Sequence, residues 1–139
     1  MTRTLFLGAI VFGLMLSEAR VSRRHERQLL ARGAVQPPGD AYRTMAVLYP
    51  LCFAALVGEG LWWASRATPA APGGPAWWVS GLLLFLASKW LKYWAIGSLG
   101  DRWSFKVIVE PGRPLVHTGP YRYLRHPNYV AVVGELVGA

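Results

Sequence analysis

Residues 115–129 concentrate cationic, aromatic and turn-forming side chains directly after strongly apolar sequence, and they read LVHTGPYRYLRHPNY. Pro127 suits the first position of a helix, because the N–H that proline lacks has no partner there. The next backbone N–H groups remain free at the positive end of the helix dipole, beside Arg125 and His126. This arrangement favours the docking of a carboxylate or a phosphate.

Three tyrosines, Tyr121, Tyr123 and Tyr129, add aromatic faces and hydroxyl groups to the same segment. Such faces hold a planar base or a cationic centre. The residues alone leave two interpretations open. One is an interfacial site for an amphipathic, adenine-containing cofactor, and the other is a juxtamembrane loop that uses Arg and Tyr as interface anchors.

The elements that position this segment are apolar stretches of nearly membrane-spanning length. Hydrophobic residues make up 53% of the 139 residues, and charged residues only 16%. A spanning helix needs about 20 apolar residues. We therefore predict one all-α membrane-embedded domain over residues 1–139, with helices at about 4–19, 45–64, 76–96 and 128–139. The first three are transmembrane helices, and the last is the start of a fourth.

The net charge of +8 would ordinarily raise nucleic acid as a partner, but the basic residues follow membrane topology instead. Arginines crowd the connection between the first two stretches, and basic residues return after the third, whereas residues 65–75 hold only Arg66. Basic segments belong on the cytoplasmic side. We predict an integral protein of the bacterial cytoplasmic membrane, with its active site facing the cytoplasm and no nucleic-acid partner. The first apolar stretch has most of its positive charge after it, whereas a signal peptide has positive charge before its apolar region, so we predict a retained helix.

Two connectors are predicted on the cytoplasmic side. Residues 20–36 have the pattern of an amphipathic helix that lies on the anionic inner leaflet. Residues 103–109 are rich in aromatic and β-branched types, residues 110–114 form a turn, and residues 115–117 return as a second strand. This pattern predicts a short β-hairpin-like connector within a cofactor-site segment at about 103–135.

Ionisable residues also occur inside the predicted spans. Lys89 and Lys92 lie three apart on one helical face. Either they reach the inner headgroups with their long side chains, or they face a polar cavity within the membrane. Glu59 is interpreted as solvated near the outer interface. Cys52 has no second cysteine, and no metal site is predicted.

Three short motifs, Leu115-Val116, Gly119-x-Tyr121 and the run from Arg125 to Tyr129, resemble the signature of the isoprenylcysteine carboxyl methyltransferase family. The region from Glu26 to Ala34 and that from Tyr42 to Tyr49 are also similar to bacterial members. The family consists of integral membrane enzymes that use S-adenosylmethionine, and phospholipid methyltransferases are similar. The resemblance implies a cofactor pocket lined by Leu115, Val116, Tyr121, His126, Pro127, Asn128, Tyr129 and Glu135, with Arg125 in support.

The resemblance also implies the reaction, which is methyl transfer to an oxygen of a lipid-tailed acceptor among membrane lipids. The acceptor is a prenylcysteine carboxylate or a phenolic or pyrone lipid. A carboxylate needs no base, whereas a phenol or enol must lose its proton, and His126 or His117 is placed to accept it. Arg125 and His126 are the candidate catalytic residues.

Two departures from the family pattern bear on this interpretation. Ala131 stands where many relatives have Gly. The family continues through a further hydrophobic hairpin to a cytoplasmic helix with an acidic pair, so we expect this chain, which stops at Ala139, to be a C-terminally truncated member. The alternatives are an NADPH-dependent membrane protein like the sterol reductases, which share the Arg-His-Pro-Asn-Tyr run, and a non-catalytic truncated membrane protein.

Overall fold

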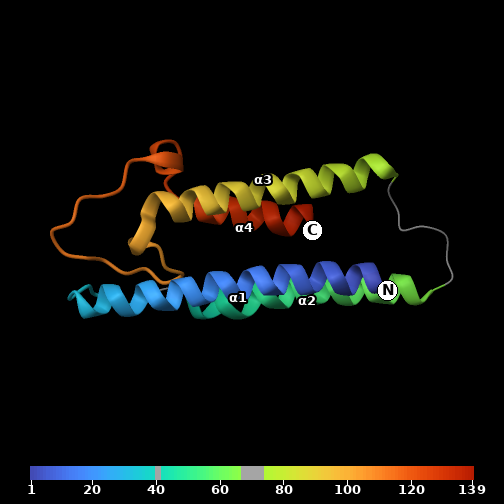
Figure 1. Ribbon diagram of the computed structural model, residues 1–139, viewed down its shortest axis with the longest axis horizontal. Helices are drawn as coiled ribbons and strands as arrows, with labels where there is room; N and C mark the ends of the chain where they lie inside the picture. Colours follow the sequence, from blue (N-terminus) through green and yellow to red (C-terminus); the bar gives the residue numbers. More distant parts are fainter. Residues whose placement is uncertain (40–41, 67–73) are drawn as a thin grey trace.

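A computed structural model of the protein describes residues 1–39, 42–66 and 74–139. Four α-helices dominate this part of the chain, with two short 3₁₀ turns before the last of them. They are α1 (Thr2–Ala31), α2 (Tyr42–Ser65), α3 (Pro75–Leu99), η1 (Gly100–Arg102), η2 (Gly119–Arg122) and α4 (Pro127–Gly138). Figure 1 shows two helix pairs, α1 beside α2 and α3 beside α4, with the connector between η1 and α4 at one end. The helices predicted at 45–64, 76–96 and 128–139 are therefore present.

The distribution of apolar and polar residues is the reverse of that in a water-soluble domain. Most large apolar side chains on α1, α2 and α3 are exposed, whereas Glu18, Lys89, Lys92 and Glu135 are buried. Two helices, α1 and α2, are long and apolar enough to cross a membrane, and few of their residues are buried inside the protein. A soluble core helix would be mostly buried, so this exposure fits contact with lipid. That α3 also crosses the membrane stays a prediction.

Helix α1 is longer than predicted. The sequence favoured a helix at 4–19 and a separate amphipathic helix on the leaflet surface, but one helix runs unbroken to Ala31. No proline interrupts it, and Gly33 ends it with a φ of +85°, a conformation that glycine adopts without strain. At 1.5 Å per residue α1 is about 45 Å long, so its arginine-rich end extends beyond a hydrocarbon core of about 30 Å.

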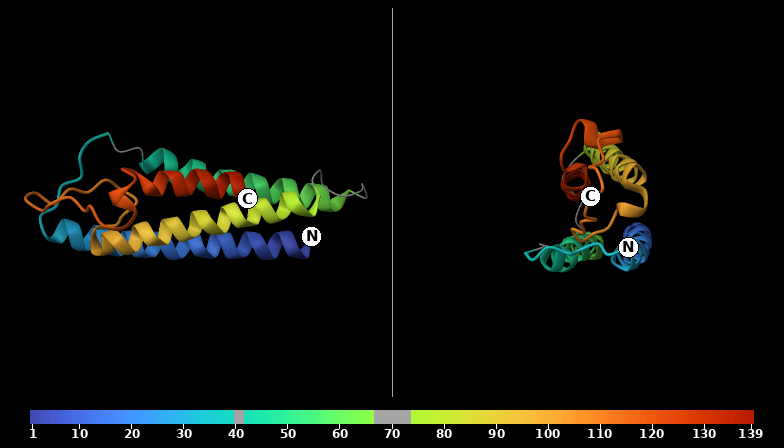
Figure 2. Two further views of the ribbon diagram at one scale, coloured as in Figure 1. Left: turned by 90° about the horizontal axis from the view of Figure 1, so that it is seen from above. Right: turned by 90° about the vertical axis from the view of Figure 1, so that its left-hand side faces the viewer.

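Small residues bring α3 and α4 close together. Ala95 and Ala131 are fully buried where the helices meet. A side chain at Gly138 would begin 2.6 Å from the backbone nitrogen of Phe85, and one at Gly134 would collide with Ser88. Close backbone approach at small residues is the usual way in which helices associate in a membrane. By contrast, the two helix pairs stand further apart, as the end-on view at the right of Figure 2 shows.

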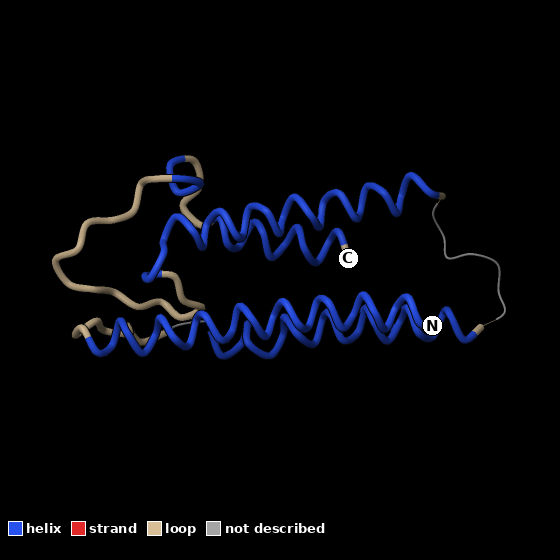
Figure 3. Tube along the Cα trace, in the orientation of Figure 1, coloured by secondary structure: helices blue, strands red, loops and turns tan. Residues whose placement is uncertain are grey.

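The predicted β-hairpin is wrong, because the part of the chain that the structure describes contains no strand (Figure 3). Residues 103–109 follow the end of α1 instead. Val109 forms an isolated antiparallel bridge with Val35, and the backbone N–H of Phe105 donates to the Ser22 hydroxyl at 2.9 Å. Ser22 on α1 and the backbone of Val35, just beyond the end of α1, thus pair with the backbone that a second strand was expected to pair.

Further contacts fasten this connector to α1. Trp103 accepts a hydrogen bond from His25 at 2.8 Å through its carbonyl, and Lys106 lies 3.0 Å from the Glu26 carboxylate. Arg32 donates to Asp101 at 2.5 Å. That hydrogen bond lowers the pKa of the Asp101 carboxyl below its usual value. The connector that leads to the motif is therefore held by the arginine-rich end of α1.

Candidate functional site

The two helix pairs are joined in their interior by a cluster of buried charges, which we call the ion cluster and which comprises Glu18, Tyr49, Lys89, Lys92 and Glu135. Each of the four helices contributes to it. Lys92 Nζ lies 3.2 Å from Glu18 Oε2 and 2.9 Å from Glu135 Oε2. Lys89 Nζ lies 3.1 Å from Glu18 Oε1 and 3.4 Å from Glu135 Oε1. Tyr49 completes the cluster by donating to Glu135 and accepting from Lys92.

The ion cluster decides between the two interpretations of the lysines. Lys89 and Lys92 are 6% and 1% exposed, so they face the interior and do not reach the headgroups. Their two positive charges balance the two carboxylates. Isolated charges in such an interior would cost several kcal/mol each, so the pairing is what allows their burial. Ionisable groups at this depth usually mark a functional site.

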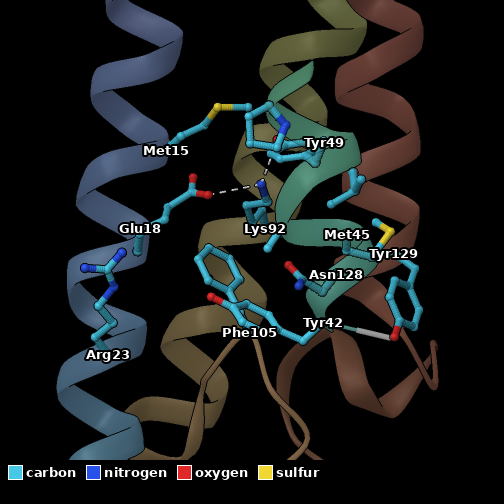
Figure 4. A pocket seen from close by; sticks show the side chains of 14 residues that line it. Met15, Glu18, Arg23, Tyr42, Met45, Tyr49, Lys92, Phe105, Asn128 and Tyr129 are labelled. Atoms are coloured by element: carbon cyan, nitrogen blue, oxygen red, sulfur yellow. Dashed lines mark hydrogen bonds and ion pairs between the residues drawn. The ribbon is translucent and has the colours of Figure 1, made fainter. Parts of the chain in front are cut away.

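A cavity of about 290 Å³ opens beside the ion cluster, between the two helix pairs (Figure 4). In Figure 4 Glu18 reaches from α1 toward Lys92, and Tyr49 approaches the same ammonium from α2. Apolar groups form most of the remaining wall. The lining residues are Met15, Glu18, Ala19, Arg23, Tyr42, Met45, Ala46, Tyr49, Pro50, Lys92, Phe105, Asn128, Tyr129 and Val132.

Asn128 lines this cavity and holds an unused polar atom. Its side-chain oxygen is buried and has no hydrogen-bond partner among the described residues. A buried acceptor without a donor is costly, and native structures rarely keep one without a reason. A ligand that offers an N–H or O–H group would satisfy it.

Only some of the motif residues expected to line one pocket line the cavity. Asn128 and Tyr129 line the cavity, and Pro127 starts α4 as predicted and is buried. Glu135 lies one turn beyond the cavity wall, in the ion cluster. The other predicted residues lie outside the lining.

Those other residues lie on the connector or at the start of α4. Leu115 is 81% exposed, Val116 is half-buried, and Arg125 is exposed. Tyr121 is half-buried in η2, where burial raises the pKa of its hydroxyl to about 12. His126 is exposed, and its ring lies tilted against the Tyr129 ring with 5.5 Å between the centroids, so it contacts a lining residue without lining the cavity itself.

Sequence reasoning missed the wall that α1 and α2 contribute, above all Glu18 and Tyr49. One signal was present, because Glu18 is the only acidic residue in the first apolar stretch. A lone carboxylate there needs a cation, and Lys89 and Lys92 were the intramembrane cations available. Tyr49 gave no comparable signal.

The fold and the site define a helical membrane protein with a charged, ligand-sized cavity between its helices. A family model described as "Isoprenylcysteine carboxyl methyltransferase (ICMT) family" matches residues 81–139. The chain belongs to this family, whose members are membrane methyltransferases with S-adenosylmethionine as methyl donor. Membership favours a methyltransferase over the reductase alternative.

Two bacterial relatives match nearly the whole chain. The uncharacterized protein YpbQ of Bacillus subtilis is 30% identical over 129 residues, which cover 93% of this chain and 73% of the relative. An uncharacterized protein of Haemophilus influenzae is 23% identical over 131 residues, which cover 94% and 72%. No solved structure matches the chain.

Proposed function

We propose that this chain binds S-adenosylmethionine in the cavity and transfers its methyl group to an oxygen of a lipid-tailed acceptor at the cytoplasmic membrane face. The acceptor is a prenylcysteine carboxylate or a phenolic or pyrone lipid. One observation carries the proposal: Asn128 and Tyr129 of the family motif line a cavity whose wall also holds the Glu18–Lys92 pair.

The lining residues fit the chemical groups of this cofactor. The aromatic rings of Tyr42, Phe105 and Tyr129 offer faces for an adenine ring or a sulfonium. The unpartnered oxygen of Asn128 suits the adenine amino group, which donates hydrogen bonds. Arg23 suits the carboxylate of the amino-acid end. When bound, the cofactor supplies a methyl group already activated by the positive sulfur.

The protein's own contribution is alignment and the exclusion of water. Met15, Met45 and Val132 give the cavity an apolar wall suited to a lipid tail. The exposed apolar faces of α1 and α2 support a position of that cavity beside lipid. Holding the acceptor oxygen in line with the methyl carbon, in a site shielded from water, lowers the barrier without any further cofactor.

Calorimetric titration of the purified protein in detergent with S-adenosylhomocysteine tests the proposal. Wild type should bind, and Tyr129→Ala should bind about 5- to 150-fold more weakly, because an aromatic face stacked on a base contributes about 1–3 kcal/mol. Tyr123→Ala is the matched control, since Tyr123 is also an exposed tyrosine near the start of α4 but does not line the cavity. Equal loss in both variants, or no binding by folded wild type, would refute the proposed site.

A further inference from the structure

Most of the cavity wall comes from outside the segment that the family model matches. Five of the fourteen lining residues lie within residues 81–139, and the other nine lie on α1 and α2. Among the described lining residues Glu18 alone carries a carboxylate. The groups that distinguish one acceptor from another are therefore expected on α1 and α2, with Glu18 the strongest of them.

Glu18 has hydrogen-bonding capacity to spare. Its Oε1 accepts from Lys89 at 3.1 Å, and its Oε2 accepts from Lys92 at 3.2 Å. An ionised carboxylate offers about four acceptor positions and no donor. Because Glu18 also lines the cavity, the ligand group that meets it must be a donor.

Lys92 has no such capacity. Its ammonium has three donors, and Glu18, Tyr49 and Glu135 each accept from it. An acceptor that carries a carboxylate would therefore find no unused N–H group at Lys92. It would also place a second negative charge beside Glu18, which a low-dielectric site disfavours.

Arg23 is the other cation in the lining, and it lies five residues after Glu18 on α1. The helix rise between the two backbones is about 7.5 Å. In the proposed function this guanidinium holds the carboxylate of the cofactor, so it is not available to a carboxylate of the acceptor.

We infer that Glu18 is a catalytic residue and that the acceptor is a lipid with an acidic hydroxyl group, a phenol or an enol, and not a carboxylate. This inference rests on the proposed function. The hydroxyl proton passes to the Glu18 carboxylate while an oxygen electron pair forms the new bond to the methyl carbon. The carbon–sulfur bond breaks with its electrons on sulfur, which leaves a neutral thioether and a methyl ether.

This assignment replaces the base expected from the motif. His117 and His126 are both exposed, and neither lines the cavity. Glu18 is 3% exposed and lies in the wall. A proton acceptor must come within hydrogen-bond reach of the acceptor hydroxyl, and Glu18 is the carboxylate that lines the cavity among the described residues.

A long-chain alkyl nitrophenol tests the contact without cofactor, because its absorbance moves to longer wavelength when its hydroxyl donates to a carboxylate or ionises. Wild type should produce this shift on binding. Glu18→Gln should abolish it and should lower methyl transfer to the same phenol by about 10²–10⁴-fold. The control Glu59→Gln replaces an exposed carboxylate on α2 and should change neither.

A second variant guards against misfolding, since Glu18→Gln leaves an excess positive charge in the ion cluster. The double variant Glu18→Gln/Lys89→Gln keeps the Lys92–Glu135 pair and restores neutrality, and Lys89 does not line the cavity. It too should fail to shift the nitrophenol. A normal shift in this variant, or faster methylation of a prenylcysteine carboxylate than of the phenol, would overturn the inference.

Binding of S-adenosylhomocysteine, measured on the same samples, separates this inference from the proposed function. Binding without a Glu18-dependent shift refutes the role of Glu18 alone. A Glu18-dependent absorbance shift without binding of S-adenosylhomocysteine supports the contact between Glu18 and the hydroxyl group but refutes the methyltransferase proposal. Loss of both in folded wild type refutes both.

Discussion

Lys92 connects more helices than any other member of the ion cluster, because its ammonium contacts groups on three other helices. Glu18 accepts from it on α1, Tyr49 on α2 and Glu135 on α4. Buried ion pairs often contribute little net stability, but removing one partner leaves an uncompensated charge. The ion cluster is therefore expected to fix how the helix pairs sit together more than to raise overall stability.

Lys92→Met should destabilise the protein by about 3–5 kcal/mol, because it strands a buried carboxylate. Lys92→Met/Glu135→Leu should recover much of that loss, since the Glu18–Lys89 pair remains neutral by itself. Denaturant unfolding in detergent measures both changes. A double variant less stable than the single one would show that Lys92 does not act through the balance of charge.

Some of the site residues could be predicted from the sequence, and others could not. The motif predicted Pro127 as the start of α4 and placed Asn128 and Tyr129 in the site, because these residues are adjacent in the chain. Leu115 and Val116 lie outside the cavity lining, since the connector follows the end of α1 instead of folding back as a hairpin. Glu18 was missed because its partners are more than 70 residues away.

At the scale of elements, the contact between α3 and α4 differs in its side chains from the contact between the two helix pairs. Helices α3 and α4 meet through small residues, whereas the two pairs meet through the ion cluster and the cavity. The close α3–α4 contact fixes the positions of Lys92 and Asn128 relative to each other. Apolar length predicted the helices, but only the packed structure shows which of them pair.

Gly134→Leu should force α3 and α4 apart, because a side chain there collides with Ser88. Overpacking of this kind costs about 1–3 kcal/mol. Val133→Leu is the matched control, since Val133 is the adjacent residue and is 59% exposed. Thermal denaturation in detergent compares them, and equal stability of the two variants would contradict the packing described.

At the scale of the whole molecule, the basic segments gather at one end of the long axis along which the helices run. The arginine-rich end of α1 and the connector that bears residues 115–126 lie at the same end (Figure 1). Ser65 ends α2 at the opposite end from Tyr42. The positive-inside rule then predicts that the motif segment, residues 115–129, lies on the cytoplasmic side. The distribution of basic residues along the sequence already indicated the same topology.

Single-cysteine labelling tests that topology, after Cys52 has been replaced by Ala. Cysteine at Gln36 should react only from the cytoplasmic side, and cysteine at Arg66 only from the outer side, because α2 separates them. A membrane-impermeant maleimide applied to intact cells and to inverted vesicles gives the readout. Labelling of both positions from the same side would contradict a membrane-crossing α2.

Photo-crosslinking of labelled S-adenosylmethionine to this chain in native membranes tests the cofactor site, with S-adenosylhomocysteine as competitor and the labelled residues mapped by mass spectrometry. Competable label is expected at the start of α4, near Asn128 and Tyr129, and on the wall from Met15 to Arg23 or from Tyr42 to Pro50. No competable label on the inserted protein, or label confined to residues 110–118, would contradict a cofactor site between the helix pairs.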